Sequence, residues 1–179
     1  MLLEVTMRKI IVSEIEEEGL RVDFNEPIEA NSLLRPAGDV KAELMLNRTE
    51  LELSIKGNIS GTVNLQCSRC LTEFQKELNL EVDLTYLPIE QMSVEEAHEI
   101  ARDESELGYY KEDEIDIVDV IREQMILNLP MKPLCVEDCK GLCPVCGTDL
   151  NLYQCDCKTE HIDPRLSVLK KLLSERKEN

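Results

Sequence analysis

The chain has 179 residues, of which 42% are hydrophobic, and its mean hydropathy is −0.26. It carries 37 acidic residues against 20 lysines and arginines, so its formal net charge is −17. This acidic balance excludes general binding to nucleic acid by the whole surface, which needs a basic protein to neutralise phosphates. With no Trp, two Phe and four Tyr, the chain also lacks the aromatic side chains of a base-stacking platform.

The length of the chain fits one domain, or one domain with a small appendage. Its longest apolar runs are shorter than the roughly 20 residues of a membrane span. The N-terminus, Met1-Leu2-Leu3-Glu4, lacks the cationic start and apolar stretch of a signal peptide. We therefore expect a cytoplasmic protein.

Residues 1–89 show the two-residue hydrophobic alternation that is typical of β-strands. The alternation predicts three hairpins, which pair residues 10–12 with 20–24, 40–46 with 51–55, and 59–67 with 74–86. We expect residues 25–39 to form a loop. The predicted fold class is α+β, with an antiparallel sheet or partly open barrel of about six strands.

Residues 90–119 are much more acidic than the rest of the chain. They hold twelve acidic residues against only Arg102 and Lys111, which gives −10 of the net charge. Ser93-Val94-Glu95-Glu96 has the pattern of a capping box for a short helix. The segment fits either a solvated linker or an acidic arm for a basic partner, and clustered acids could also bind Mg²⁺ in an unrecognised hydrolase.

Residues 116–129 carry the strongest helical pattern, which Pro130 ends. Their apolar positions cover more than one stripe, so we expect this helix to pack against the sheet. Asp163-Pro164 is a typical start for a terminal helix. The predicted organisation is a β region over 1–89, an acidic helix or linker over 90–114, and a helix with a cysteine-rich metal-binding tail over 115–179.

Cysteine is the most unusual feature of the composition, with eight residues: Cys67, Cys70, Cys135, Cys139, Cys143, Cys146, Cys155 and Cys157. A disulfide framework suits small secreted domains, and a redox dithiol suits a strand–helix junction, so neither matches this context. Zn²⁺ prefers four tetrahedral ligands, and C-x2-C turns are common in its sites. In Cys143-Pro144-Val145-Cys146-Gly147, the Pro pre-sets the turn and the Gly permits a left-handed backbone. Thiolate binding of one or two zinc ions is therefore the favoured interpretation.

The spacing suggests how the cysteines divide between two sites. One set is local in the sequence and comprises Cys143, Cys146, Cys155 and Cys157. The other set comprises Cys67, Cys70, Cys135 and Cys139, and it would tie the tip of the third hairpin to the tail. A rival partition groups residues 135–146 and leaves Cys67 and Cys70 elsewhere, and His161 could replace Cys155 because only one residue separates Cys155 from Cys157.

Several enzyme classes lack their motifs in this chain. Catalytic zinc usually involves His and keeps an open position, but the only histidines are His98 and His161. The sequence contains no G-x-S-x-G, P-loop or dinucleotide-binding motif. We therefore expect no catalytic residues.

Two stretches together resemble the YceD family. Residues 65–74 (LQCSRCLTEF) are similar to its C-x-R-C motif. Residues 129–151, Cys155-Asp156-Cys157 and Asp163-Pro164-Arg165-Leu166 are similar to its metal-binding tail, and the match spans residues 5–175. The resemblance implies a role in the accumulation of large-subunit ribosomal RNA in bacteria and plastids.

Family genes often lie beside that of a zinc-ribbon protein of the large ribosomal subunit. The resemblance implies a factor in ribosome biogenesis, and the absence of enzyme motifs predicts that it is non-catalytic. The gene neighbourhood and the acidic segment suggest a basic large-subunit ribosomal protein as its partner, with precursor ribosomal RNA as the other candidate. Contact with RNA would need local basic residues, for which the candidates are Arg69, Arg165, Lys170 and Lys171. The alternative is a thiol redox or zinc-sensing switch that uses Cys67 and Cys70.

Overall fold

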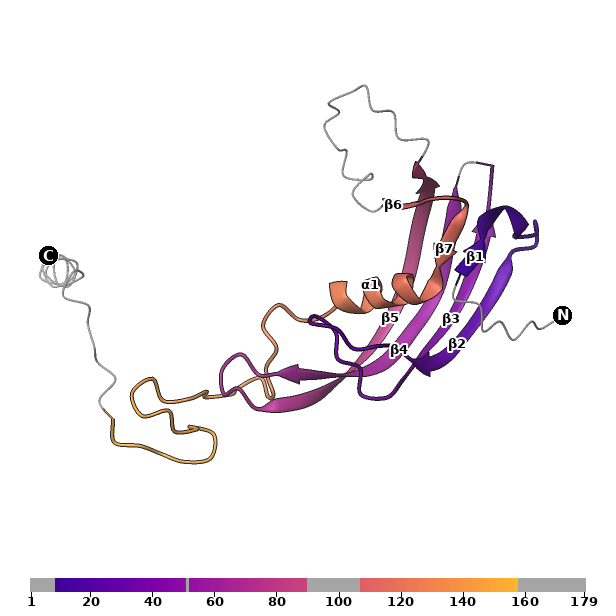
Figure 1. Ribbon diagram of the computed structural model, residues 1–179. Coiled ribbons are helices and arrows are strands. Elements are labelled where there is room, and N and C mark those ends of the chain that lie inside the picture. The colour runs from indigo at the N-terminus through magenta and orange to yellow at the C-terminus, as the bar shows by residue number, and fades with distance from the viewer. Residues whose placement is uncertain (1–8, 51, 90–106, 158–179) are drawn as a thin grey trace, which may run out of the picture. The chain divides into compact units, whose positions relative to one another are not determined.

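A computed structural model of the chain describes residues 9–50, 52–89 and 107–157 (Figure 1). These residues fall into two compact units. The first contains the described residues up to Gln66 and those between Glu73 and Pro133. The second contains Cys67–Thr72 and the described residues from Leu134 onward, so it includes all eight cysteines.

The first unit is built on a five-stranded sheet with strand order β2-β3-β4-β5-β6. The strands are β2 (Leu20–Pro27), β3 (Asp39–Arg48), β4 (Leu53–Gln66), β5 (Glu73–Pro88) and β6 (Leu107–Tyr110). Strands β2 to β5 pair antiparallel, but β6 pairs parallel to β5. The sheet is therefore mixed and open, which corrects the expectation of an antiparallel sheet or partly open barrel. A parallel neighbour needs a connection of a dozen or more residues, and the stretch between Pro88 and Leu107 supplies that length.

The prediction that residues 10–12 pair with residues 20–24 in a first hairpin is wrong. Residues 9–11 form β1 (Lys9–Ile11), which pairs antiparallel with β7 (Glu114–Asp116) and not with β2. After β1 the chain enters a short 3-10 turn, Val12–Glu14, and Val12 N donates to Asp113 O at 2.8 Å. Hydrophobic alternation fixes which face of a strand is buried, but it does not specify a partner that lies about a hundred residues away.

The second and third predicted hairpins form but share a strand. Strand β4 runs unbroken for 14 residues and pairs with β3 along its first half and with β5 along its whole length. Gly57 keeps this strand continuous, because a Cβ added there would lie 2.0 Å from the carbonyl oxygen of Glu43 on β3. Strands β4 and β5 stay in register up to Gln66 and Glu73, so residues 67–72 form the turn at the end of this hairpin, which we call the hairpin tip.

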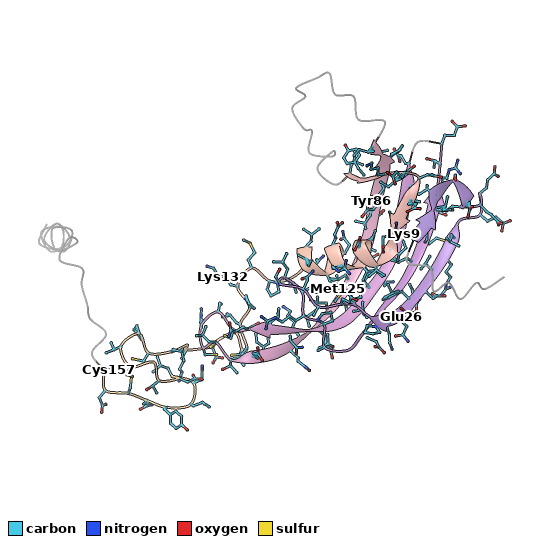
Figure 2. All side chains as sticks on the ribbon, viewed as in Figure 1. Lys9, Glu26, Tyr86, Met125, Lys132 and Cys157 are labelled. Carbon is cyan, nitrogen blue, oxygen red and sulfur yellow. The ribbon has the colours of Figure 1, made fainter. Side chains whose placement is uncertain are left out.

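One helix, α1 (Ile117–Leu127), covers one face of this sheet, as Figures 1 and 2 show. The side chain of Asp116 caps the helix by accepting hydrogen bonds from Val118 N and Asp119 N. Met125 is fully buried, and the missing side chain at Gly61 of β4 leaves room for it, since an added Cβ would lie 3.3 Å from Met125 Cε. The predicted helix and its packing against the sheet are therefore confirmed.

Part of the predicted acidic linker is structured. Residues 107–110 form β6, and the segment ends where β7 begins at Glu114. The predicted helix start at residues 93–96 and the predicted terminal helix lie outside the described residues. Within the described part of the chain, no helix has the length and apolar character to cross a membrane.

Candidate metal centre

The second unit gathers the eight cysteines into two groups of four. In each group the four sulfur atoms all lie within 4.8 Å of one another. The hairpin-tip group comprises Cys67, Cys70, Cys135 and Cys139, and the tail group comprises Cys143, Cys146, Cys155 and Cys157. This is the first of the two divisions of the eight cysteines that the sequence spacing suggested. None of the eight forms a disulfide, and the tail group contains four sulfurs, whereas His161, the alternative ligand to Cys155, lies outside the described residues.

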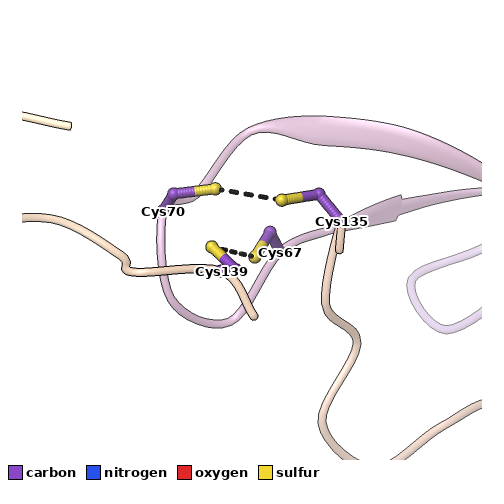
Figure 3. Close-up of side chains that lie close together, drawn as sticks. All are labelled: Cys67, Cys70, Cys135 and Cys139. Atoms are coloured by element: carbon purple, nitrogen blue, oxygen red, sulfur yellow. Dashed lines mark hydrogen bonds between the residues drawn. The ribbon is translucent and has the colours of Figure 1, made fainter. Parts of the chain in front are cut away.

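In the hairpin-tip group, two cysteines come from the tip and two come from the segment after Pro133 (Figure 3). Cys70 Sγ lies 3.5 Å from Cys135 Sγ, and Cys67 Sγ lies 3.7 Å from Cys139 Sγ. Cys67 is completely buried, and Cys139 is 1% exposed. Four sulfur atoms are thus brought together in a site that is largely closed to solvent.

The tip turn has a specific hydrogen-bond pattern. Leu71 N donates to Cys67 O at 3.0 Å, and Cys67 N donates to Thr72 O at 2.9 Å. Leu71 has a φ of 62°, which is uncommon for a residue with a side chain. This left-handed residue reverses the chain directly after Cys70, so that the turn closes around both sulfurs.

The tail group repeats the same turn. Gly147 N donates to Cys143 O at 2.9 Å, Cys143 N donates to Thr148 O at 2.8 Å, and Gly147 has a φ of 74°. Each turn therefore follows the pattern Cys-x-x-Cys, one left-handed residue, then Thr. Sequence analysis singled out the Gly of the second turn but missed the Thr shared by both turns, which was visible as C-x2-C-x-T.

Arg69 lies within the hairpin tip and helps to hold it in place. Its Nη1 donates to Cys139 O at 2.7 Å, and its own carbonyl oxygen accepts from Leu142 N at 3.2 Å. A Cβ added at Gly141 would lie 3.0 Å from that carbonyl oxygen, so only glycine fits this close approach. We predicted the guanidinium of Arg69 as an RNA contact. In the structure it forms a hydrogen bond within the second unit, to the backbone of Cys139.

The other three predicted basic contacts, Arg165, Lys170 and Lys171, lie outside the described residues.

Electrostatics divide three thiols of the hairpin-tip group into two with a lowered pKa, Cys67 and Cys70, and one with a raised pKa, Cys135. Burial opposes ionisation of Cys67, but backbone N–H groups of Cys70, Cys135 and Arg69 outweigh it and lower its pKa to about 6. The hydroxyl of Thr72 and its backbone lower the pKa of Cys70. The hydrogen bond with Cys70, together with burial, raises the pKa of Cys135 to about 12.

The tail group shows the same division. The hydroxyl and the backbone of Thr148 lower the pKa of Cys146 to about 6, and Cys146 Sγ lies 3.1 Å from Thr148 Oγ1. The hydrogen bond with Cys146, burial and the charge of Cys146 raise the pKa of Cys157 to about 12. In each group the turn thus stabilises the thiolates of the Cys-x-x-Cys pair, and hydrogen bonding to these sulfurs favours the protonated form of Cys135 in one group and Cys157 in the other.

These donor sets fit a tetrahedral thiolate-binding metal ion such as Zn²⁺. Four sulfurs in a closed arrangement are typical of structural zinc sites, and they leave no open position for a substrate. A divalent cation would also remove the reason why part of each group stays protonated, because its charge offsets that of the thiolates. The sites therefore have the composition and electrostatics of two structural metal centres.

We expect Thr148→Val to make Cys146 less acidic, because the change removes the hydroxyl that stabilises its thiolate. In metal-free protein, the pH midpoint for alkylation of Cys146 should move from about 6 toward the ordinary thiol value near 8.5, as followed by peptide mass mapping. Val145→Ala is the matched control, since this side chain lies in the same turn and is 63% exposed. An unchanged midpoint in Thr148→Val would contradict this account of the turn.

Comparison with known proteins points to one family. The family model described as "Large ribosomal RNA subunit accumulation protein YceD" matches residues 55–173, a range that includes all eight cysteines. The Bacillus subtilis protein YlbN is 30% identical over 159 residues, which cover 86% of each chain. No solved structure matches the chain.

Two further relatives carry the family's name. The Haemophilus influenzae protein named large ribosomal RNA subunit accumulation protein YceD is 25% identical over 70% of this chain and 74% of its own length. The Arabidopsis thaliana chloroplastic YCED homolog 1 is 28% identical over 69% of this chain and 45% of its own length. The chain belongs to the YceD family.

Proposed function

We propose that this chain is a non-catalytic factor that binds one zinc ion in each four-cysteine group and supports the accumulation of large-subunit ribosomal RNA. The observation that carries the proposal is the pair of closed four-sulfur groups, each built on the same turn. The process is taken from the family, whose Haemophilus and Arabidopsis members are named as accumulation proteins.

Such ions would give residues 134–157 of the second unit a defined shape. Its residues 134–157 contain no helix or strand apart from the isolated bridge between Leu142 and Asp149. Val145, Leu152 and Tyr153 are 63%, 72% and 68% exposed, so they supply little hydrophobic core. A loop-rich segment with so little buried apolar surface is ordinarily held by metal ions or disulfides.

The zinc ions would act as structural ties and not as reaction centres. Zn²⁺ would join the hairpin tip at Cys67 and Cys70 to the tail at Cys135 and Cys139, and a second ion would close the loop from Cys143 to Cys157. What Zn²⁺ supplies when bound is charge compensation for four thiolates. The chain's own residues, chiefly the two threonines and the left-handed Leu71 and Gly147, orient the sulfurs.

The alternative of a redox or zinc-sensing switch at Cys67 and Cys70 has one observation in its favour, the lowered pKa values of these thiols. Their burial favours the structural role, because Cys67 is 0% exposed and Cys70 is 7% exposed. A switch that exchanges thiols with a partner needs an accessible sulfur. We therefore favour a closed zinc site at this position.

The net charge favours a basic protein over RNA as the direct partner. Eight thiolates and two Zn²⁺ change the formal charge from −17 to −21, since −17 − 8 + 4 = −21.

In the first unit, a hollow of about 370 Å³ between β6, β7 and α1 is lined by five carboxylates against Lys9 and Lys111. Three tyrosines, Tyr86, Tyr109 and Tyr110, line the same hollow, and aromatic faces and carboxylates are both attractive to Arg and Lys side chains.

We expect removal of the chain from its own host to lower the ratio of large-subunit to small-subunit ribosomal RNA. The wild-type chain should restore the ratio, whereas a chain with Cys143→Ser and Cys146→Ser should not, because the tail group would lose two ligands. Val145→Ala, which lies between these cysteines, serves as the control and should restore it. The measurement is quantification of both ribosomal RNAs, and an unchanged ratio after removal would contradict the proposed process.

We also expect the purified chain to bind proteins extracted from large ribosomal subunits, in a salt-sensitive manner, and not a transcribed precursor of the large-subunit RNA. Glu123→Gln should weaken this binding, because Glu123 lines the acidic hollow. Glu29→Gln, an exposed change on a different segment, should leave it intact. Tight binding to the RNA transcript, with none to the basic proteins, would show that RNA is the direct partner.

A further inference from the structure

One side chain of the tail contacts the hairpin-tip group directly. Asn151 lies between Cys146 and Cys155 in the sequence, within the loop of the tail group. Its Nδ2 nevertheless donates a hydrogen bond to Sγ of Cys139, a member of the hairpin-tip group, at 3.4 Å. The two groups are therefore joined through a side chain that is not itself a candidate ligand.

The orientation of the Asn151 amide follows from its other contacts. Lys140 N donates to Asn151 Oδ1 at 2.8 Å, and a backbone N–H can only donate, so the amide oxygen must face it. The NH₂ group then faces the sulfur of Cys139 and Oδ1 of Asp149, which lies 2.7 Å from Nδ2. The amide is thus held with its donor toward Cys139.

The turn that presents Asn151 is continuous with the Cys143 turn of the tail group. The carbonyl oxygen of Asp149 accepts from Leu152 N and Tyr153 N at 3.2 and 2.9 Å. Asp149 also forms the isolated bridge with Leu142, directly beside Cys143, whose N–H is bonded to Thr148. Whatever fixes the Cys143 turn therefore also fixes the position of the Asn151 amide.

We propose that Asn151 couples the two four-cysteine groups, so that a metal ion bound in one strengthens the retention of a metal ion in the other. This inference rests on the proposed function, because it requires both groups to bind metal. An ion in the tail group would hold the turn that aims the amide at Cys139. The amide would in turn stabilise the Cys139 thiolate as a ligand, and such coupling acts equally in both directions.

The size of the effect can be bounded. Loss of a hydrogen-bond partner of a metal ligand typically lowers metal affinity by about 10- to 100-fold. Asn151 is itself exposed, so water partly replaces its amide when it is removed. We therefore expect a loss near the lower end, about tenfold, in the affinity of the hairpin-tip group.

The test compares the full-length wild-type chain with Asn151→Ala, both loaded with Zn²⁺ and titrated with a chelator. Native mass spectrometry counts the zinc ions, and alkylation with peptide mapping shows which group has lost its ion. In the wild type, the form with one zinc should be scarce. In Asn151→Ala it should accumulate with the hairpin-tip cysteines alkylated first, whereas Leu152→Ala, a neighbouring side chain that is 72% exposed, should behave as the wild type.

A second variant keeps the test decisive if Asn151→Ala disturbs the fold of the loop. A chain with Cys155→Ser and Cys157→Ser should lose about tenfold in zinc affinity at the hairpin-tip group, and the same change in the Asn151→Ala background should cause no further loss. An equal loss in both backgrounds, or unaltered zinc retention in Asn151→Ala, would overturn the coupling alone. A wild-type chain that binds no zinc would overturn the proposed function as well.

Discussion

Four sulfur atoms held within 4.8 Å of one another set the central constraint on this molecule. Two thiolates about 4 Å apart repel each other by about 4 kcal/mol at an effective dielectric constant of about 20. Hydrogen bonds from the turns lower the pKa of Cys67 and Cys146, whereas hydrogen bonds with neighbouring thiols and burial raise the pKa of Cys135 and Cys157. A divalent cation would allow all four to ionise, so the two groups are candidate metal centres.

The long hairpin explains how half of one centre is built. Strands β4 and β5 remain in register up to the residues that flank the tip, so Cys67 and Cys70 are delivered by a continuous antiparallel ladder. Cys135 and Cys139 come from positions 65 and 72 residues further along the chain. Arg69 and Gly141 help to hold these distant segments together, because the Arg69 guanidinium donates to Cys139 O and Gly141 lies close to the carbonyl oxygen of Arg69. The arginine of the C-x-R-C motif thus helps to fix the hairpin tip, and the cysteines on either side of it are candidate metal ligands.

Local patterns in the sequence predicted much of this arrangement. Alternation located strands β2 to β5, the helical stripe located α1, and the counting of cysteines in fours produced the grouping that the structure has. Strand pairings between segments far apart in the sequence were not predictable in this way. Strand β1 pairs with β7, about a hundred residues further along the chain, and β6 pairs parallel to β5 after a long connection. Neither pairing leaves a periodic signal in the sequence. The link from Asn151 to Cys139 was missed because it depends on the folded loop and not on any spacing.

The most direct test of the account is the metal content of native, unchelated protein, combined with X-ray absorption at the zinc edge and a count of reactive thiols. The account predicts two zinc ions per chain, each surrounded by four sulfurs at about 2.3 Å, with all eight thiols protected until a chelator is added. Protein that contains no metal and has eight reactive thiols would contradict it. In that case the redox interpretation of Cys67 and Cys70 would take its place.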